Sequence, residues 1–369
     1  MRLVLTGGGT GGHIYPALAI GREVAEKEPG SELLYIGTKK GLESRIVPAQ
    51  GLPFESIDIS GIRRSLSLEN VRTVIRFIQG VRRSKALLKR FKPDIVVGTG
   101  GYVCGPVVYA ASRLGIPTLI HEQNVVPGLT NKFLSRYASG VAVSFEDSLP
   151  HFARVGNVKY AGNPVASTMV KANKAQGYAS LGLAPGTPFV LVTGGSGGAR
   201  ALNDAVLAML PGLVSLAGVH LVLVTGDRYY EQTAERVKAL PADVAKRVHV
   251  LSYVNNMPEV LAASSMIISR AGASFLAEVT SLGVPAVLIP SPNVTNNHQQ
   301  PNAESLAAAG AAEMILEKDL SGDGLLRSVS SIMRDAELRE KMAKASRRLG
   351  TPNAATAIYE QMLELIHRK

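Results

Sequence analysis

Residues 2–12, RLVLTGGGTGG, place a short apolar run directly before a cluster of five glycines. Residues 189–199, FVLVTGGSGGA, repeat this order 187 residues later (194 − 7). After the first cluster, residues 14–27 carry apolar side chains at helical spacing. Strand, glycine-rich turn and helix in this order are typical of doubly wound α/β folds. Gly7–Gly12 is called the first glycine-rich turn below, and Gly194–Ala199 the second.

Other segments repeat the same order of elements. Short apolar runs at 94–97, 116–120, 266–268 and 286–289 indicate further buried strands of a parallel sheet. LGIPTLI at 114–120 returns as LGVPAVLI at 282–289, 168 residues later (282 − 114). The sequence therefore predicts an α/β protein with two similar doubly wound domains.

The segment Gly162–Pro164 (GNP) has the composition of a hinge between the two domains. We expect an N-terminal domain over 1–162, a C-terminal domain over 163–345, and a terminal helix over 346–369 that can pack back on the first domain. Ligands of open parallel sheets bind at the carboxyl ends of the strands. Loops from both domains are therefore expected to line one cleft.

Composition excludes several classes of protein. The 369 residues are 46% hydrophobic, which excludes a disordered chain. Cys104 is the single cysteine, which excludes a disulfide-stapled fold and fits a reducing cytoplasm. No apolar run reaches the roughly 18 residues of a membrane span, and the sequence starts with a strand rather than a signal peptide.

The net charge of +11 is concentrated in one segment. Residues 61–92 hold ten basic side chains and one acidic side chain, so this segment alone carries +9 (10 − 1). Basic and apolar residues alternate there, as in helices that lie on anionic membranes. The predicted membrane patch consists of Arg72, Val74, Arg76, Phe77, Ile78, Val81, Arg82 and Arg83. An ordinary packing helix is the alternative; nucleic acid is not expected as a partner, because stacking aromatics are scarce there.

The first glycine-rich turn predicts an anion-binding loop, with a tight structural turn as the alternative. A dinucleotide is disfavoured, because GTKK at 37–40 lacks the acid that a ribose needs. His13 follows the turn directly. A helix N-terminus favours neutral imidazole, so His13 is a candidate general base; a capping or packing histidine is the alternative.

Three further segments carry candidate binding groups. Ser196 adds a hydroxyl donor to the second turn. Glu278 follows the loop 269–274 by one helical turn, where a carboxylate can accept the two hydroxyls of a ribose or simply face solvent. The amide-rich segment 293–302 (NVTNNHQQPN), expected as a polar loop after a strand, suits a ligand with many hydroxyls, although it is also compatible with a solvated loop. The segment 121–124 (HEQN), which ends a strand of the first domain, is similarly rich in polar side chains.

The sequence predicts neither a metal site nor a cofactor. Its seven histidines do not pair at ligand spacing. A P-loop and a nucleophile elbow are both missing. Two anion-binding turns, a carboxylate for a ribose, amide-rich loops and one candidate base together indicate transfer of a sugar from a nucleotide diphosphate to a hydroxyl.

The order of these motifs resembles one known family. GGGTGGHIYPALAI, GTGGYVCGP, HEQNVVPGLTNK, GGSGGARALN, SRAGASFLAE and NHQQPNA span about residues 3–305. The chain resembles the MurG family of bacterial glycosyltransferases. The resemblance implies a GT-B fold and inverting, metal-free transfer of N-acetylglucosamine (GlcNAc) from UDP-GlcNAc to the C4 hydroxyl of the N-acetylmuramoyl (MurNAc) sugar of lipid I, which forms lipid II. It also implies a peripheral position on the cytoplasmic face of the cell membrane.

The resemblance also implies roles for single residues. His13 matches the proposed base, Asn124 and Gln299 match contacts to the sugar, and Glu278 matches the contact to the ribose. The implied substrate-binding residues are Thr10, Gly11, Gly12, Asn124, Ser196, Val254, Ala273, Ser274, Phe275, Leu276, Ala277, Glu278 and Gln299.

Two positions depart from the family pattern. Gly197 stands where the family usually has glutamine, and Ala166 where it usually has an arginine for the donor phosphates. The missing arginine implies either a lower affinity for the donor or a substitute cation nearby, such as Arg200. A UDP-GlcNAc 2-epimerase and a membrane scaffold without activity are the two rival interpretations, and a carboxylate instead of His13 is the rival base.

Overall fold

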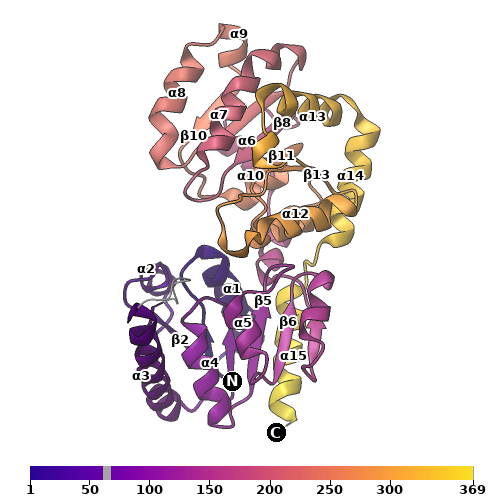
Figure 1. Ribbon diagram of the computed structural model, residues 1–369. Helices are drawn as coiled ribbons and strands as arrows, with labels where there is room; N and C mark the ends of the chain where they lie inside the picture. The colour runs from indigo at the N-terminus through magenta and orange to yellow at the C-terminus, as the bar shows by residue number, and fades with distance from the viewer. Residues whose placement is uncertain (61–67, 369) are drawn as a thin grey trace. The chain divides into compact units, whose positions relative to one another are not determined.

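The computed structural model describes residues 1–60 and 68–368. The chain forms two compact units (Figure 1). Unit 1 comprises Met1–Ser167 and Thr351–Lys369, and unit 2 comprises Thr168–Gly350. Each unit contains one parallel sheet covered by helices, which confirms the predicted α/β class with two doubly wound domains.

The sheet of unit 1 has seven parallel strands. In spatial order they are β3 (Phe54–Ile57), β2 (Glu32–Thr38), β1 (Arg2–Thr6), β4 (Ile95–Gly98), β5 (Thr118–Glu122), β6 (Gly140–Val143) and β7 (Val158–Tyr160). The strand order reverses between β1 and β4, where Thr6 pairs with Gly98. The loops after these two strands therefore start side by side, at the position where doubly wound sheets bind ligands.

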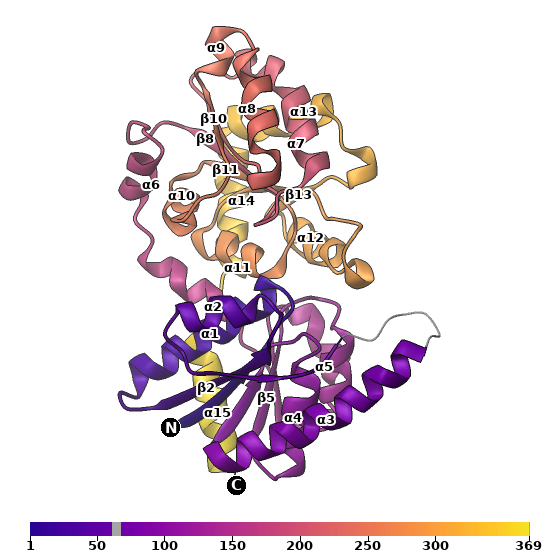
Figure 2. The ribbon, with the colours of Figure 1, turned by 90° about the vertical axis from the view of Figure 1, so that its left-hand side faces the viewer.

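Alternate side chains of these strands enter two separate cores. Leu3 and Leu5 pack with α1 (Gly11–Lys27) and α15 (Ala354–His367). Val4 packs on the opposite face, against helices α3 (Leu68–Phe91) and α4 (Cys104–Arg113). Figure 2 shows α1 and α15 on one side of the sheet and α3, α4 and α5 (Leu129–Leu134) on the other. The C-terminal helix thus contributes to the core of unit 1, beside the first helix of the chain.

The remaining helices of unit 1 lie at its loops. They are α2 (Glu43–Ala49) and the 3₁₀ segment η1 (Glu146–Phe152), and a second 3₁₀ segment, η2 (Pro164–Lys171), continues into unit 2. The units change at Ser167/Thr168 and at Gly350/Thr351, whereas the boundaries expected from the sequence were 162/163 and 345/346.

The sheet of unit 2 repeats the topology of the first with six strands. Their spatial order is β10 (Val248–Leu251), β9 (His220–Val224), β8 (Phe189–Thr193), β11 (Met266–Ser269), β12 (Ala286–Leu288) and β13 (Ala312–Met314). The order again reverses at the middle, between β8 and β11, where Thr193 pairs with Ser269. The second glycine-rich turn and the loop after β11 therefore begin side by side.

Helices cover both faces of this second sheet. They are α6 (Lys174–Ser180), α7 (Arg200–Met209), α8 (Tyr230–Lys238), α9 (Ala242–Ala245), α10 (Met257–Ala263), α11 (Ala273–Leu282), α12 (Gln299–Ala308), α13 (Gly322–Arg334) and α14 (Ala336–Leu349), with 3₁₀ segments η3 (Leu210–Ser215), η4 (Asp227–Tyr229), η5 (Thr295–Asn297) and η6 (Glu317–Asp319). Figure 2 shows α7, α8 and α13 on one side of the sheet and α6 and α10 on the other. Within residues 1–60 and 68–368, none of the helices combines the length and apolar character that crossing a membrane requires.

Candidate active site

The first glycine-rich turn joins β1 to α1 at the switch point of the sheet. The first two glycines of the turn have no room for side chains: a Cβ atom at Gly7 would lie 2.2 Å from Thr99 Oγ1, and one at Gly8 would lie 2.7 Å from the Glu43 carboxylate. Gly9 has a φ of +85°, which is a conformation that favours glycine. The helix begins at Gly11, three residues before the predicted start at 14. Gly11 and Gly12 therefore lie in the first helical turn, where backbone N–H groups are available to an anion.

His13 is the third residue of α1 and is partly exposed. Its Nδ1 lies 2.9 Å from the Gly8 carbonyl oxygen and 3.4 Å from Thr10 Oγ1. A carbonyl oxygen only accepts hydrogen bonds, so Nδ1 carries the proton and the lone pair of the neutral ring lies on Nε2. The backbone of Gly100 packs against the ring, because a Cβ atom there would lie 2.7 Å from His13 Cδ2. The ring is thus held in one tautomer and one orientation, as a general base requires.

The HEQN segment at the end of β5 is organised by the buried carboxylate of Glu122. This carboxylate accepts hydrogen bonds from Asn124 N at 3.0 Å, Asn124 Nδ2 at 3.2 Å and Gly128 N at 3.1 Å. Asn131 Nδ2, which the sequence analysis did not select, donates to it at 2.8 Å. The predicted sugar-binding side chain of Asn124 is therefore oriented by the carboxylate of Glu122, the last residue of β5.

His121 in the same segment has a structural role. Its Nε2 lies 3.0 Å from the Gly162 carbonyl oxygen, and Gln123 Nε2 lies 3.0 Å from its Nδ1. Burial lowers the pKa of His121 to about 4, so the ring is neutral at physiological pH.

The second glycine-rich turn joins β8 to α7 and is more exposed than the first. Gly195 and Gly198 have φ of +88° and +70°, and a Cβ atom at Gly198 would lie 1.9 Å from the Thr225 carbonyl oxygen. Gly197 differs from both, because its φ is not in the left-handed region and a Cβ atom there meets no described atom within 4 Å. Ser196 is exposed at the tip of this turn.

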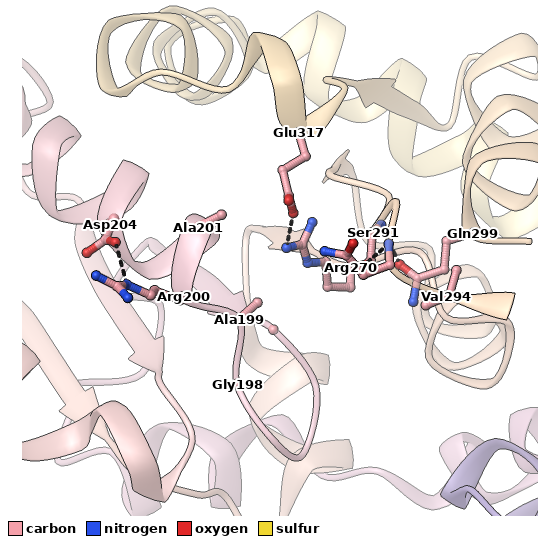
Figure 3. A pocket seen from close by; sticks show the side chains of 12 residues that line it. Gly198, Ala199, Arg200, Ala201, Asp204, Arg270, Ser291, Val294, Gln299 and Glu317 are labelled. Carbon is pink, nitrogen blue, oxygen red and sulfur yellow. Dashed lines mark hydrogen bonds and ion pairs between the residues drawn. The ribbon is translucent and has the colours of Figure 1, made fainter. Parts of the chain in front are cut away.

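A pocket of about 650 Å³ opens where this turn meets α7 (Figure 3). It is lined by Gly194, Gly198, Ala199, Arg200, Ala201, Asp204, Arg270, Ser291, Asn293, Val294, Gln299 and Glu317. Arg200 and Asp204 lie on α7, with Arg200 Nε 3.6 Å from Asp204 Oδ2, and the arginine side chain is 82% exposed. The start of α7 and Arg200 together give the pocket the features of an anion site.

The opposite wall of the pocket is held by Arg270, which follows β11. Its guanidinium group pairs with Glu317 and donates to the Ile289 carbonyl oxygen at 3.1 Å. Gln299 lies beside it and accepts from Ser291 N at 2.9 Å through its amide oxygen, which directs its Nε2 as the donor available to a ligand (Figure 3). Glu317 was not among the predicted site residues, because it is distant in sequence from every motif.

The other predicted residues of unit 2 lie outside the described pocket lining. Val254, in the segment that joins β10 to α10, is buried. Ala273–Glu278 begin α11, and Ser274 has a buried hydroxyl without a partner among the described residues. Burial raises the pKa of Glu278 to about 7.

The polar segment 293–302 is only partly a loop. Helix α12 begins at Gln299, so the expectation of a loop through Asn302 was wrong. Asn302 is fully buried, and its Nδ2 donates to the Ala271 carbonyl oxygen at 3.3 Å. This amide therefore ties α12 to the loop after β11.

The predicted membrane patch lies on α3. Val74 and Ile78 are 56% and 49% exposed, respectively. The neighbouring side chains of Arg76, Arg82 and Arg83 are exposed as well. Phe77 and Val81 differ from the expectation: both are partly buried and pack against the core of unit 1. The side chain of Arg72 lies outside the described residues.

Ala166, the second departure from the family pattern, lies fully buried in η2. Its backbone N donates to the Asn163 carbonyl oxygen at 3.0 Å. Arg200, the candidate substitute cation, lines the pocket beside the second turn.

Both halves of the chain match models of one family. Residues 3–143 match the glycosyltransferase family 28 N-terminal domain, and residues 189–358 match the glycosyltransferase family 28 C-terminal domain. A relative from Bacillus cereus, named UDP-N-acetylglucosamine–N-acetylmuramyl-(pentapeptide) pyrophosphoryl-undecaprenol N-acetylglucosamine transferase 1, is 50% identical over 370 residues that cover 100% of both chains.

Solved structures agree with this match. The crystal structure of MurG from Acinetobacter baumannii superposes with a TM-score of 0.79 at 30% identity, covering 98% of this chain and 99% of that chain. A putative UDP-N-acetylglucosamine 2-epimerase from Listeria monocytogenes superposes with a TM-score of 0.72 at 14% identity, covering 100% of this chain and 97% of that chain. At that identity, the likeness to the epimerase shows a shared fold.

Proposed function

The chain belongs to glycosyltransferase family 28, and from this premise we propose that it transfers N-acetylglucosamine from UDP-GlcNAc to the MurNAc sugar of lipid I. The product is lipid II, the precursor of peptidoglycan. The observation that carries the proposal is the 50% identity over its whole length to a relative named for this transfer. The fold and the resemblance recognised in the sequence agree with it.

Unit 2 is proposed to bind the donor. The pocket beside the second turn combines the start of α7 with Arg200, which suits the diphosphate of UDP-GlcNAc. Gln299 Nε2 is a donor for a hydroxyl or carbonyl oxygen of the sugar. Glu278 is proposed to accept the ribose hydroxyls, and Val254 to contact the uracil through its backbone.

His13 is proposed as the general base. The C4 hydroxyl of the acceptor attacks the anomeric carbon of GlcNAc from the side opposite UDP. The new C–O bond forms as the bond to the diphosphate breaks, so the configuration inverts and UDP leaves with the bonding electrons. The hydroxyl proton goes to His13 Nε2, since Nδ1 already carries one. Backbone N–H groups and Arg200 stabilise the departing diphosphate.

The α3 patch is proposed to hold the enzyme on the cytoplasmic face of the membrane. Val74 and Ile78 offer apolar surface, and Arg76, Arg82 and Arg83 offer charge to anionic lipid. An acceptor with an undecaprenyl chain resides in that membrane, so a peripheral enzyme meets it there.

A transfer assay tests this proposal. The protein is incubated with UDP-GlcNAc, with and without a lipid I analogue, and the products are separated by mass. We expect a GlcNAc-extended lipid only when the acceptor is present, and much less product with UDP-GalNAc. Epimerised or released sugar without acceptor would support the 2-epimerase instead, and no reaction in either sample would support a scaffold.

A further inference from the structure

Glu43, the first residue of α2, is a fully buried carboxylate directly below the first glycine-rich turn. Its Oε1 accepts from Thr38 N at 3.1 Å and from Thr38 Oγ1 at 2.6 Å. Its Oε2 accepts from Gly9 N at 3.2 Å. Within the described residues these donors are all neutral, so the negative charge is held by hydrogen bonds alone.

The surrounding sequence leaves space for this carboxylate. A Cβ atom would lie 2.7 Å from Glu43 Oε1 at Gly8, 2.2 Å from the same oxygen at Gly41, and 2.7 Å from Glu43 Cγ at Gly37. Three glycines from two segments thus make room for one side chain. Burying a carboxylate without a cation costs several kcal/mol unless hydrogen bonds offset it.

One peptide group connects this carboxylate to His13. The N–H of Gly9 donates to Glu43 Oε2, and the carbonyl oxygen of Gly8 accepts from His13 Nδ1 at 2.9 Å. These two groups belong to the same peptide unit and point in opposite directions. Chains of hydrogen bonds polarise one another, so a carboxylate on the N–H side makes the carbonyl oxygen a stronger acceptor.

We infer that Glu43 is a positioning residue for His13, acting through the Gly8–Gly9 peptide: it holds the ring with its proton on Nδ1 and stabilises the imidazolium ion that proton transfer creates. This inference rests on the proposed function for the role of His13 as base. In other general-base pairs, a carboxylate is hydrogen-bonded directly to the histidine and stabilises its imidazolium form. Here the Gly8–Gly9 peptide lies between the two groups and transmits this effect.

Other groups around Glu43 and His13 do not replace this charge. Burial raises the pKa of Cys104 to about 12 and raises that of Tyr35 well above its usual value, so both remain neutral. Tyr102 lies beside Gly9. The charged side chains that flank α2, Lys39, Lys40 and Arg45, are exposed, so water screens them.

The inference is tested by measuring the protonation of His13 directly, without any substrate. Protein labelled with [¹⁵N]histidine is titrated by NMR, and the signal of His13 is assigned by its loss in His13→Ala. We expect the wild-type ring to carry its proton on Nδ1. Glu43→Gln removes the anion but keeps the shape, so the pKa of His13 should fall by about 0.5–1 unit, because the imidazolium loses its stabilisation.

Tyr35→Phe is the matched control. It removes a buried hydrogen bond of the same turn, from Tyr35 Oη to the Gly7 carbonyl oxygen at 2.7 Å, and leaves the Gly8–Gly9 peptide bonded at both ends. We expect it to lower stability without moving the pKa of His13. An unchanged tautomer and pKa in a folded Glu43→Gln variant would overturn the inference, and so would an equal shift in Tyr35→Phe.

A measurement on the wild type covers the case in which Glu43→Gln does not fold. The amide proton shift of Gly9 should titrate with the same pKa as the His13 ring, because one peptide joins them. A Gly9 shift that stays constant through the titration of His13 would overturn the inference.

Kinetics separate this inference from the proposed function. In the transfer assay, Glu43→Gln should lower kcat about tenfold, leave the KM for UDP-GlcNAc unchanged, and move the acid limb of the kcat/KM profile to lower pH. A wild type that binds UDP and transfers nothing would refute the proposed function, while the NMR outcome would still decide whether Glu43 is coupled to His13.

Discussion

The two glycine-rich turns follow equivalent strands of the two sheets, but the side chains that surround them differ. Gly7–Gly12 packs over the buried carboxylate of Glu43 and leads into a helix that carries His13 in its first turn. Gly194–Ala199 opens into a pocket of about 650 Å³ and leads into a helix that begins with the exposed Arg200.

In the proposed mechanism, this difference lets one topology serve two chemical tasks. The first turn packs on the buried side chain of Glu43 and holds the His13 ring in one orientation, which suits proton transfer. The second turn leaves its helix N-terminus and a cation open to a ligand, which suits binding of a diphosphate. Changes in the first turn should therefore alter turnover, and changes in the second should alter donor binding.

The largest expected effect is that of His13→Ala on turnover. Loss of a general base should lower kcat by about two to four orders of magnitude. The measurement is steady-state transfer to a lipid I analogue at saturating UDP-GlcNAc. Turnover within threefold of the wild type would remove His13 from the mechanism and leave the carboxylate alternative.

Two adjacent glycines of the second turn should respond very differently to alanine. Gly198→Ala forces a side chain into a left-handed backbone and against the Thr225 carbonyl oxygen, so it should cost about 3 kcal/mol and weaken UDP binding strongly. Gly197→Ala meets neither obstacle and should change stability by less than about 0.5 kcal/mol. Urea unfolding and UDP titration of both variants check this contrast; equal losses would show that the turn is not shaped as described.

His121 in unit 1 and Glu278 in unit 2 should respond to pH in opposite directions. The pKa of His121 is lowered to about 4, so its contribution to the stability of unit 1 is present above pH 6.5 and is lost as the pH falls toward 4. The pKa of Glu278 is raised to about 7, so its contribution to unit 2 is present below pH 4.5 and is lost as the pH rises toward 7. Each change amounts to about 3 kcal/mol.

Amide hydrogen exchange, which follows each unit separately, measures these slopes. His121→Asn should flatten the pH dependence of unit 1 alone, and Glu278→Gln that of unit 2 alone. A variant whose slope equals that of the wild type would show that the altered group does not titrate as described.

The smallest expected effect concerns the α3 patch. Val74→Ser combined with Ile78→Ser removes exposed apolar area, so binding to vesicles with anionic lipid should weaken about tenfold. UDP affinity should stay unchanged, because neither residue is near the second turn in sequence or belongs to unit 2. Unaltered sedimentation with vesicles would exclude these two side chains from the membrane contact.

Much of the fold could be predicted because local patterns and topology agree. The apolar runs at 2–6 and 189–193 coincide with β1 and β8, and the glycines after them coincide with the switch points of both sheets. The start of α12 was not predicted, because the run of amide side chains has no apolar residues at helical spacing and therefore resembles a loop.

The candidate site was only partly visible in the sequence. Motif residues such as His13 and Gln299 stand in distinctive segments. Glu43 and Glu317 do not stand in such segments, and their partners Gly9 and Arg270 are 34 and 47 residues away in the sequence. From the sequence alone, a buried acidic residue cannot be distinguished from an exposed one. Only the structure shows that glycines surround Glu43.

In the proposed mechanism, the first turn carries the base and the second turn holds the donor. Calorimetric titration of UDP into wild-type protein and His13→Ala, with transfer measured on the same samples, tests it most directly. We expect both proteins to bind UDP with dissociation constants within about threefold, and only the wild type to form product at its full rate. Loss of UDP binding in parallel with turnover, or no UDP binding by the folded wild type, would contradict it.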